Sequence, residues 1–305
     1  MQWQDNIEAA YQRIAGRIVQ TPVLQSAAFG RDIALKLEQM QHTGSFKTRG
    51  AFNTLLAEDV PEAGVVAASG GNHGAAVAFA ARQLGHRARI FVPEMAGPSK
   101  IALIERTGAE LTVVPGEYAN ALELAQREAA EGGAMQIHAY DAPLTVAGQG
   151  TVMLEWERQG LDADTVLIAV GGGGLIGGAL AWLGGRRKIV AVEPMTSCAL
   201  NEALEKGAPV DVPVSGVAAN ALGARRIGQI CFDLAKDAHV ESVLVSDGAI
   251  IQAQQALWQA HRQLVEPAGA TALAALMSGA YVPDPQERVA VLVCGGNIAP
   301  DPQIA

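Results

Sequence analysis

The chain has 305 residues, of which 50% are hydrophobic and 17% charged, so we expect a globular protein of about two domains. Its formal net charge of -9 argues against a nucleic-acid or anionic-membrane partner, because both need clustered basic side chains. Cys198, Cys231 and Cys294 show no metal-ligand spacing, which argues against a disulfide framework or a structural zinc site and fits a reducing cytosol. The amino terminus lacks the basic start and apolar segment of a secretory signal, so a cytoplasmic protein is expected.

Short β-branched segments alternate along the chain with longer Ala-rich segments of helical period. This alternation is typical of parallel strands joined by helices. The amino-terminal part predicts a helix over 5–18 and a strand over 33–37. A first α/β block predicts strands over 65–68, 88–92 and 111–114, with helices over 75–84, 99–107 and 119–131. A second block predicts a helix over 148–159, a strand over 165–170, a helix after four glycines, strands over 188–192 and 242–245, helices over 247–264 and 269–278, and a strand over 289–293.

The predicted fold class is α/β, with two open, twisted, mostly parallel sheets flanked by helices. The amino-terminal helix and strand have no partner in the first block, so we place them with the second. The smaller domain is then inserted in the larger, which is predicted to comprise residues 1–52 and 144–305, with 53–143 forming the smaller. The uncharged run 165–185 contains four consecutive glycines after a short apolar strand, which predicts a strand, a loop and a buried helix rather than a membrane span.

One lysine, Lys47, lies between the aromatic Phe46 and a small polar turn, just after the apolar run 33–37. A strand end holds side chains rigidly, and partial burial lowers the pKa of an ammonium group toward the range in which it can form a Schiff base. The alternative is a solvated surface lysine, which describes most lysines. Lys47 is therefore the first candidate for chemistry.

Two glycine loops each follow a predicted strand and begin a predicted helix. The first is Ser69-Gly70-Gly71-Asn72-His73-Gly74, and the second is Gly171-Gly172-Gly173-Gly174. Glycine lets a backbone approach a ligand closely, and the exposed amides and dipole of the following helix favour an anion. Both loops are candidate anion sites, and close packing of strand against helix without a ligand is the alternative.

The second loop also supports a different enzyme class. Gly172, Gly174 and Gly177 satisfy G-x-G-x-x-G between a strand and a helix, and Glu193 ends the next strand where a ribose-binding acid would lie. An NAD-dependent oxidoreductase is therefore an alternative. It leaves Lys47 and the Asn72 loop without a role.

Six motifs taken in order resemble the pyridoxal-phosphate enzymes of the tryptophan-synthase β fold, also called fold type II. The closest likeness is to the serine/threonine dehydratase and serine racemase group. It extends from Thr21-Pro22 to Asn297, nearly the whole chain. The motifs are Ser45-Phe46-Lys47-Thr48-Arg49-Gly50-Ala51, Ser69 to Gly74, Ala147-Gly148-Gln149-Gly150-Thr151, Gly171 to Gly174, Glu266-Pro267 and Cys294-Gly295-Gly296-Asn297.

The resemblance implies pyridoxal 5'-phosphate as cofactor and a role for each motif. Lys47 would bind the cofactor as a Schiff base and act as the catalytic base, with Phe46 against the ring and Asn72 on the ring hydroxyl. The phosphate would lie on the second loop, and the substrate carboxylate on the first, where His73 has the alternative of a structural histidine. The implied cofactor-binding residues are Phe46, Lys47, Asn72, Gly171, Gly172, Gly173, Gly174, Leu175, Glu266 and Cys294; the implied substrate-binding residues are Ser69, Gly70, Gly71, Asn72 and His73.

The implied reaction is β-elimination of water from L-threonine, L-serine or a related β-hydroxy amino acid, giving a 2-oxo acid and ammonia. A serine or aspartate-type racemase, a β-replacement enzyme of the same fold and a catalytically silent binding protein remain alternatives. A homodimer or higher homo-oligomer is expected by analogy. Because the chain ends soon after Asn297, no carboxy-terminal effector domain is expected. Residues 215 and 218–221 are candidates for the pocket that holds the substrate side chain.

Three positions depart from the group. Cys294 replaces the usual Ser or Thr near the pyridine nitrogen, so a neutral thiol would leave that nitrogen largely unprotonated, whereas a thiolate would favour the pyridinium form. Gly70 replaces the serine that racemases place opposite the lysine, which favours dehydration over racemisation. Residues 195–200 supply no carboxylate beside Glu193, so no divalent metal site is expected.

Overall fold

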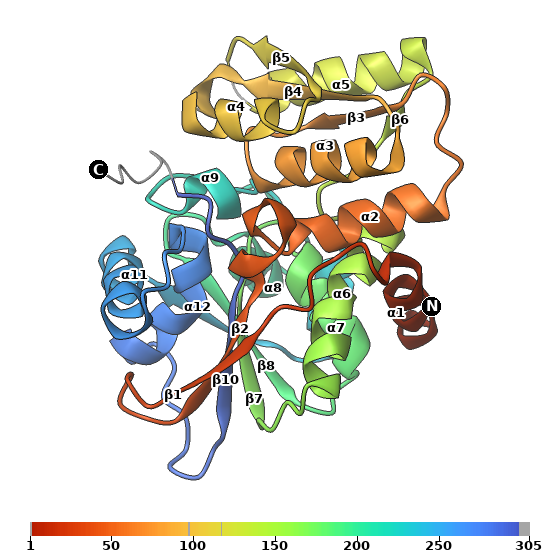
Figure 1. Cartoon of the computed structure of the whole chain (residues 1–305). Helices are drawn as coiled ribbons and strands as arrows, with labels where there is room; N and C mark the ends of the chain where they lie inside the picture. The colour runs from red at the N-terminus through yellow and green to blue at the C-terminus, as the bar shows by residue number, and fades with distance from the viewer. Residues whose placement is uncertain (1, 97, 117, 299–305) are drawn as a thin grey trace.

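The computed structural model describes residues 2–96, 98–116 and 118–298 (Figure 1). Its larger sheet has the strand order β1-β2-β10-β7-β8-β9, in which only β1 runs antiparallel to its neighbour. The strands are β1 (Val23–Ser26), β2 (Ile33–Leu37), β7 (Thr165–Ala169), β8 (Lys188–Pro194), β9 (Glu241–Val245) and β10 (Val289–Val293).

The smaller sheet is wholly parallel, with the strand order β5-β4-β3-β6. Its strands are β3 (Val65–Ala68), β4 (Ala88–Pro93), β5 (Glu110–Val114) and β6 (Met135–Gln136). Helices α3 (Asn72–Leu84), α4 (Pro98–Glu105) and α5 (Tyr118–Gly132) surround it in Figure 1. The predicted α/β class with two mostly parallel sheets is confirmed; the exact boundaries of the two domains stay a prediction.

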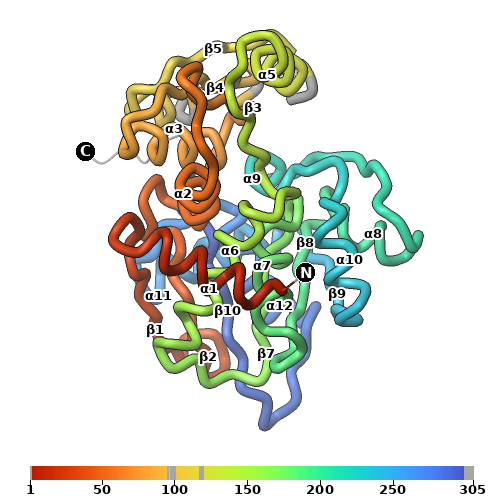
Figure 2. The backbone as a smooth tube through the Cα atoms, turned by 90° about the vertical axis from the view of Figure 1, so that its right-hand side faces the viewer, coloured from red at the N-terminus to blue at the C-terminus, as the bar shows by residue number. Residues whose placement is uncertain are grey.

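Helices cover both faces of the larger sheet. On one side α11 (Asp247–His261) packs on α12 (Pro267–Ser278), which contacts β7 to β10; on the other, α7 (Gly174–Leu183) packs on α6 (Pro143–Arg158) (Figure 1). The remaining helices are α1 (Trp3–Ile14), α2 (Lys47–Ala57), α8 (Ala199–Lys206), α9 (Ala219–Leu222) and α10 (Gln229–Asp237), with short 3-10 turns η1 (Glu38–Met40), η2 (His42–Gly44) and η3 (Glu94–Ala96). The tube view of Figure 2 shows α2 between the two sheets, where it contacts both α3 and α6.

The amino-terminal segment belongs to the larger sheet, as predicted, because β2 pairs in parallel with β10. The run 165–185 forms β7, the glycine loop and buried helix α7, also as predicted. Among the described residues no helix is both long and apolar enough to cross a bilayer.

The prediction of Lys47 at a strand end is wrong, since Lys47 begins helix α2. Gly50 suggested a turn, but it lies in the helix interior, where a β-carbon would lie 2.3 Å from the Gln149 side chain of α6. The same holds for Gly148 of α6, where a β-carbon would lie 2.6 Å from the Cα of Gly50. These glycines therefore allow two helices to pack closely.

Several predicted bounds also need correction. The first helix ends at Ile14 rather than residue 18, and α11 ends at His261 rather than 264, because Arg262 adopts φ 56°. Helix α6 begins at Pro143, five residues earlier than predicted, with proline in its first turn, where a missing N–H costs nothing. Strands β1 and β6 and helices α8 to α10 were not predicted.

Candidate active site

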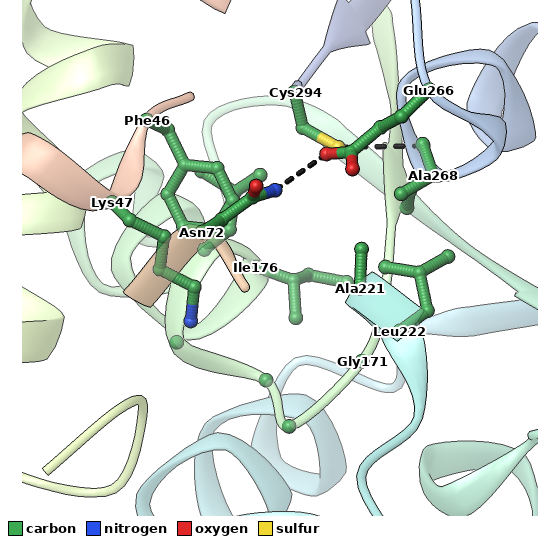
Figure 3. Close-up of a pocket in the computed structure, with 15 residues that line it drawn as sticks. Phe46, Lys47, Asn72, Gly171, Ile176, Ala221, Leu222, Glu266, Ala268 and Cys294 are labelled. Carbon is green, nitrogen blue, oxygen red and sulfur yellow. Dashed lines mark hydrogen bonds between the residues drawn. The ribbon is translucent and has the colours of Figure 1, made fainter. Parts of the chain in front are cut away.

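A pocket lies at the carboxyl ends of β7 and β10, where the glycine loop and the starts of α2, α3 and α12 meet (Figure 3). In parallel sheets this edge is where ligands bind. Figure 3 shows Lys47 and Glu266 approaching from opposite sides. The lining residues are Phe46, Lys47, Asn72, Ala169, Gly171, Gly172, Gly173, Gly174, Leu175, Ile176, Ala221, Leu222, Glu266, Ala268 and Cys294. Every predicted cofactor-binding residue is therefore in one place.

The amine of Lys47 contacts the segment that joins the two sheets. Its Nζ donates a hydrogen bond to the backbone oxygen of Ala139 at 2.7 Å and lies 5.2 Å from the centre of the Phe46 ring. Burial lowers the pKa of Lys47 to about 8, because an ammonium loses hydration there. About a tenth of the amine is therefore unprotonated at pH 7, far more than for an exposed lysine, and this fraction can act as a nucleophile or base.

Helix α2, which carries Lys47, is fixed by a buried ion cluster of Lys36, Glu38, Arg49 and Glu155. Arg49 Nη2 lies 2.7 Å from Glu38 Oε1 and 2.9 Å from Glu155 Oε1, and Lys36 Nζ lies 2.6 Å from the same Glu155 oxygen. All four side chains are at most 1% exposed. Buried charges tolerate little displacement once paired, so the cluster ties α2 to η1, β2 and α6.

The glycine loop between β7 and α7 has no room for side chains. A β-carbon at Gly172 would lie 2.3 Å from the ring of Tyr140, and one at Gly171 would lie 2.9 Å from the Cα of Leu222. Gly173 has φ +95°, a left-handed conformation that favours glycine. Helix α7 begins at Gly174, and Gly174 and Leu175 line the pocket, so the start of this helix favours an anion there.

Tyr140 is a neighbour of this loop that sequence reasoning missed. It comes from the segment that joins the two sheets, packs edge-on against His138 with ring centres 4.9 Å apart, and covers Gly172 and Gly174. Burial raises the pKa of the Tyr140 phenol, so it stays neutral. No motif marks this residue, because its contact with the loop depends on the path of the chain.

Asn72 begins α3 and reaches the pocket from the smaller sheet. Its Nδ2 donates to Glu266 Oε1 at 2.5 Å, the bond drawn in Figure 3, and its Oδ1 accepts a hydrogen bond from Asn297 at 2.9 Å. Asn72 thus connects the two sheets through side chains at the pocket.

Cys294 directly follows β10 and is a buried neutral thiol. Its Sγ donates to the backbone oxygen of Ala268 at 3.3 Å, and burial raises the pKa of the thiol well above its usual range. Of the two states considered from the sequence, the structure favours the thiol over the thiolate.

The other predicted substrate residues, Ser69, Gly70, Gly71 and His73, are not among the residues that line this pocket. Ser69 Oγ accepts from the Gly71 amide at 3.1 Å, and Gly70 packs against Ala96. The His73 ring donates through Nε2 to Ile137 O at 2.9 Å, and burial lowers the pKa of His73 to about 3, so it is neutral. This geometry favours the structural alternative for His73; the substrate roles stay predictions. Of residues 215 and 218–221, only Ala221 is part of the described lining.

The side chain of Glu193 caps a helix and does not face a ligand site. Its carboxyl group is fully buried and accepts hydrogen bonds from the amides of Leu200 and Asn201, at 2.8 Å each, at the start of α8. It is therefore not exposed to bind a ribose. Within the part of the chain that the structure describes, no group of three His, Cys, Asp or Glu side chains is arranged to hold a metal ion.

Comparison with known proteins decides between the enzyme classes. Residues 14–295 match the family model described as pyridoxal-phosphate dependent enzyme. The chain belongs to this family. The oxidoreductase alternative is therefore wrong, whereas the role of the glycine loop in holding the cofactor phosphate stays a prediction.

Curated relatives and solved structures agree with the family. L-Threonine ammonia-lyase of Geobacter sulfurreducens is 35% identical over 96% of this chain and 75% of the relative, and phenylserine dehydratase of Ralstonia pickettii is 35% identical over 91% and 87%. Threonine deaminase from T.th. superimposes with a TM-score of 0.90 at 35% identity, covering 98% of this chain and 99% of the other. Maize serine racemase superimposes with a TM-score of 0.91 at 31% identity, covering 97% of this chain and 93% of the other.

The pocket suits pyridoxal 5'-phosphate by its own chemistry. A dianionic phosphate fits helix-start amides in a loop that excludes side chains, a flat ring fits beside Phe46, and an aldehyde fits the partly deprotonated Lys47 amine. The side-chain amide of Asn72 lies near Phe46 and Glu266 in the pocket, where it can form a hydrogen bond with a polar group on the ring.

Proposed function

We propose that this protein is a pyridoxal-phosphate-dependent ammonia-lyase that eliminates water from L-threonine, L-serine or a related β-hydroxy amino acid, releasing a 2-oxo acid and ammonia. The observation that carries the proposal is the Lys47 amine, with its pKa near 8, in one pocket with the glycine loop and Asn72. The relatives named threonine ammonia-lyase and phenylserine dehydratase support the substrate class.

When bound, the cofactor supplies an electron sink for the charge that develops at the substrate α-carbon. The chain supplies the base: the free amine of Lys47 removes the α proton, and its Nζ is then an ammonium within reach of the Ala139 carbonyl. The glycine loop anchors the anionic end, and Phe46 restricts the plane in which the reacting atoms lie. The β hydroxyl takes up the proton that Lys47 removed and departs as water. The enamine that Lys47 then releases is hydrolysed by a water molecule to the 2-oxo acid and ammonia.

The neutral Cys294 thiol favours elimination over longer-lived carbanion chemistry. A thiol that already donates to Ala268 O is a poor donor to a ring nitrogen, which therefore stays largely unprotonated. An unprotonated ring nitrogen withdraws less of the negative charge from the substrate α-carbon. Prompt loss of the β hydroxyl is then favoured over reactions that need a long-lived carbanion.

The packing of Gly70 argues against the racemase alternative. A β-carbon there would lie 2.3 Å from the β-carbon of Ala96, so the space that a serine would need is filled. Position 70 therefore carries no side chain that could act as an acid–base group opposite Lys47. Racemisation requires such a group, whereas elimination needs only the lysine.

The test is a 2-oxo acid and ammonia assay on L-threonine, L-serine, phenylserine, both 3-hydroxyaspartate isomers and the D forms. Lys47→Ala should abolish turnover and the bound-cofactor absorbance, and Lys206→Ala, at an exposed lysine, should leave both unchanged. Full activity in Lys47→Ala, or D-serine formed from L-serine in place of pyruvate, would overturn the proposal.

Two further expectations belong with this function. A cytoplasmic location is expected from the cysteine usage, and a homodimer or higher homo-oligomer from analogy with the fold. Sedimentation of the holoenzyme at several concentrations measures the assembly, and a monomer at every concentration would contradict it.

A further inference from the structure

The Cys294-Gly295-Gly296-Asn297 motif ends in an asparagine to which the proposed reaction gives no task. This segment pairs with the one before Lys47: Phe46 N donates to Cys294 O at 3.3 Å, and Gly296 N donates to Gly44 O at 2.9 Å. Asn297 therefore lies beside the Thr43-Gly44 turn. Its side chain fits because Gly44 has no β-carbon, which would lie 2.4 Å from Asn297 Oδ1.

Hydrogen-bond chemistry fixes the orientation of the Asn297 amide. Its Nδ2 lies 2.7 Å from the backbone oxygen of Thr43, which can only accept, so the NH₂ group must face that way. Thr43 adopts φ 60°, a left-handed conformation that is costly for a β-branched residue, and it is this turn that aims its carbonyl at Asn297.

The fixed Asn297 amide in turn orients Asn72. The same Nδ2 donates its second hydrogen to Asn72 Oδ1 at 2.9 Å, so the Asn72 NH₂ group faces the other way, toward Glu266 Oε1 at 2.5 Å. One N–H of Asn72 is used by Glu266. The other belongs to a group that lines the pocket, so Asn72 presents a donor there rather than its carbonyl oxygen.

We propose that Asn297 is a positioning residue that sets the amide of Asn72 as a hydrogen-bond donor toward the ring hydroxyl of the cofactor. This inference rests on the proposed cofactor role of Asn72. A donor at that point favours the ionised hydroxyl and so lowers its pKa. Asn297 also ties the start of α3, from the smaller sheet, to the turn before Lys47, which sets the separation of the two cofactor contacts.

The test measures the pH midpoint of the cofactor absorbance change and the dissociation constant for pyridoxal 5'-phosphate. In Asn297→Ala, Asn72 loses one of its two anchors, and the midpoint should rise by about half a pH unit. In Asn297→Asp, the carboxylate accepts and reverses the Asn72 amide, so the midpoint should rise by about one unit and affinity fall about tenfold. Asn6→Asp makes the same change at an exposed site of α1 and should behave as wild type.

The neutral Ala variant separates orientation from added charge. If it keeps the wild-type midpoint, Asn297 does not orient Asn72 and the inference fails, even if affinity falls. Thermal unfolding of the cofactor-free proteins shows whether each variant is folded. The Ala and Asp variants give two independent measurements of the pH midpoint. Wild-type protein that binds the cofactor but releases no 2-oxo acid would reject the proposed function, while the order of midpoints would still decide the role of Asn297.

Discussion

The amine of Lys47 lies 2.7 Å from the backbone oxygen of Ala139, in the segment that joins the smaller sheet to the larger. A carbonyl oxygen cannot take a proton from the ammonium, and burial brings the pKa of Lys47 down to about 8. The uptake of pyridoxal 5'-phosphate by cofactor-free protein should therefore accelerate between pH 7 and 9 with a midpoint near 8. Stopped-flow absorbance measures it, and a midpoint near that of a free lysine would contradict the buried amine.

The contact between Tyr140 and Gly172 predicts opposite effects at two glycines of one segment. Gly172→Ala places a methyl group 2.3 Å from the Tyr140 ring, and the shift it forces should cost about 1–3 kcal/mol of stability and weaken cofactor binding. Gly177→Ala makes only ordinary contacts at 3.6 Å and should stabilise α7 by up to about 1 kcal/mol. Urea unfolding and cofactor titration of both variants test this pair, and equal effects would be evidence against the close approach.

The order of strands and helices could be predicted because it depends on local periodicity. The run 289–293 is apolar throughout and the run 165–170 is apolar after Thr165, which indicates strands buried on both faces, and the structure confirms them as β7 and β10. Helix α2 could not be predicted in this way. Gly50 resembles a turn signal locally, and its packing against α6 is visible only in three dimensions.

The same distinction applies to the site. Lys47 and the glycine loop are recognisable as candidates from their residue types and local context, and the structure brings them into one pocket. Tyr140 and Asn297 act through contacts with residues 32 and 225 positions away, Gly172 and Asn72, which no local pattern records. His73 was ambiguous for a related reason, since its partner is a backbone carbonyl far along the chain, at Ile137.

Gly70→Ser tests whether packing alone keeps a racemase-type serine out. The new side chain would meet Ala96, so the variant should lose about 1–3 kcal/mol of stability and form no D-serine. Adding Ala96→Gly should restore most of the lost stability. Thermal unfolding and chiral product analysis of both variants are the measurements, and an undiminished melting temperature in Gly70→Ser would refute the packing argument.

Glu193 predicts a specific pH dependence of stability. Burial raises its pKa from 4.5 to about 7, so the folded protein keeps this proton up to about pH 7 whereas the unfolded chain releases it near 4.5. The stabilisation is full below pH 4.5 and is lost as the pH rises through 7. Glu193→Gln stays neutral, so its stability relative to wild type should improve by up to about 1.4 kcal/mol per pH unit across that window.

Urea unfolding at pH 5, 6 and 7 measures the difference for Glu193→Gln. The exposed Glu205→Gln is the control and should run parallel to wild type. A Glu193→Gln curve that also runs parallel would show that the buried carboxyl titrates normally.

Removal of Arg49 from the buried ion cluster should cause a large loss of folding stability. Arg49→Met leaves Glu38 and Glu155 with Lys36 as their remaining cationic partner in the cluster, and should destabilise the protein by about 3–5 kcal/mol. The matched change Arg158→Met, at an exposed pair with Glu8, should cost under about 1 kcal/mol. Denaturant midpoints of the two variants give the comparison, and similar losses would contradict the role of burial.

The pairing of residues 294–297 with residues 43–46 has a consequence for synthesis in the cell. The lysine segment leaves the ribosome about 250 residues before the segment that pairs with it, and β10, which lies between β2 and β7, comes just as late. In a nascent chain that lacks residues 289–297, Lys47 therefore has no completed pocket around it and keeps the ordinary, high pKa of an exposed lysine. The lowered pKa of Lys47 is thus a property of the assembled fold rather than of the local sequence, and it depends on a segment about 250 residues away.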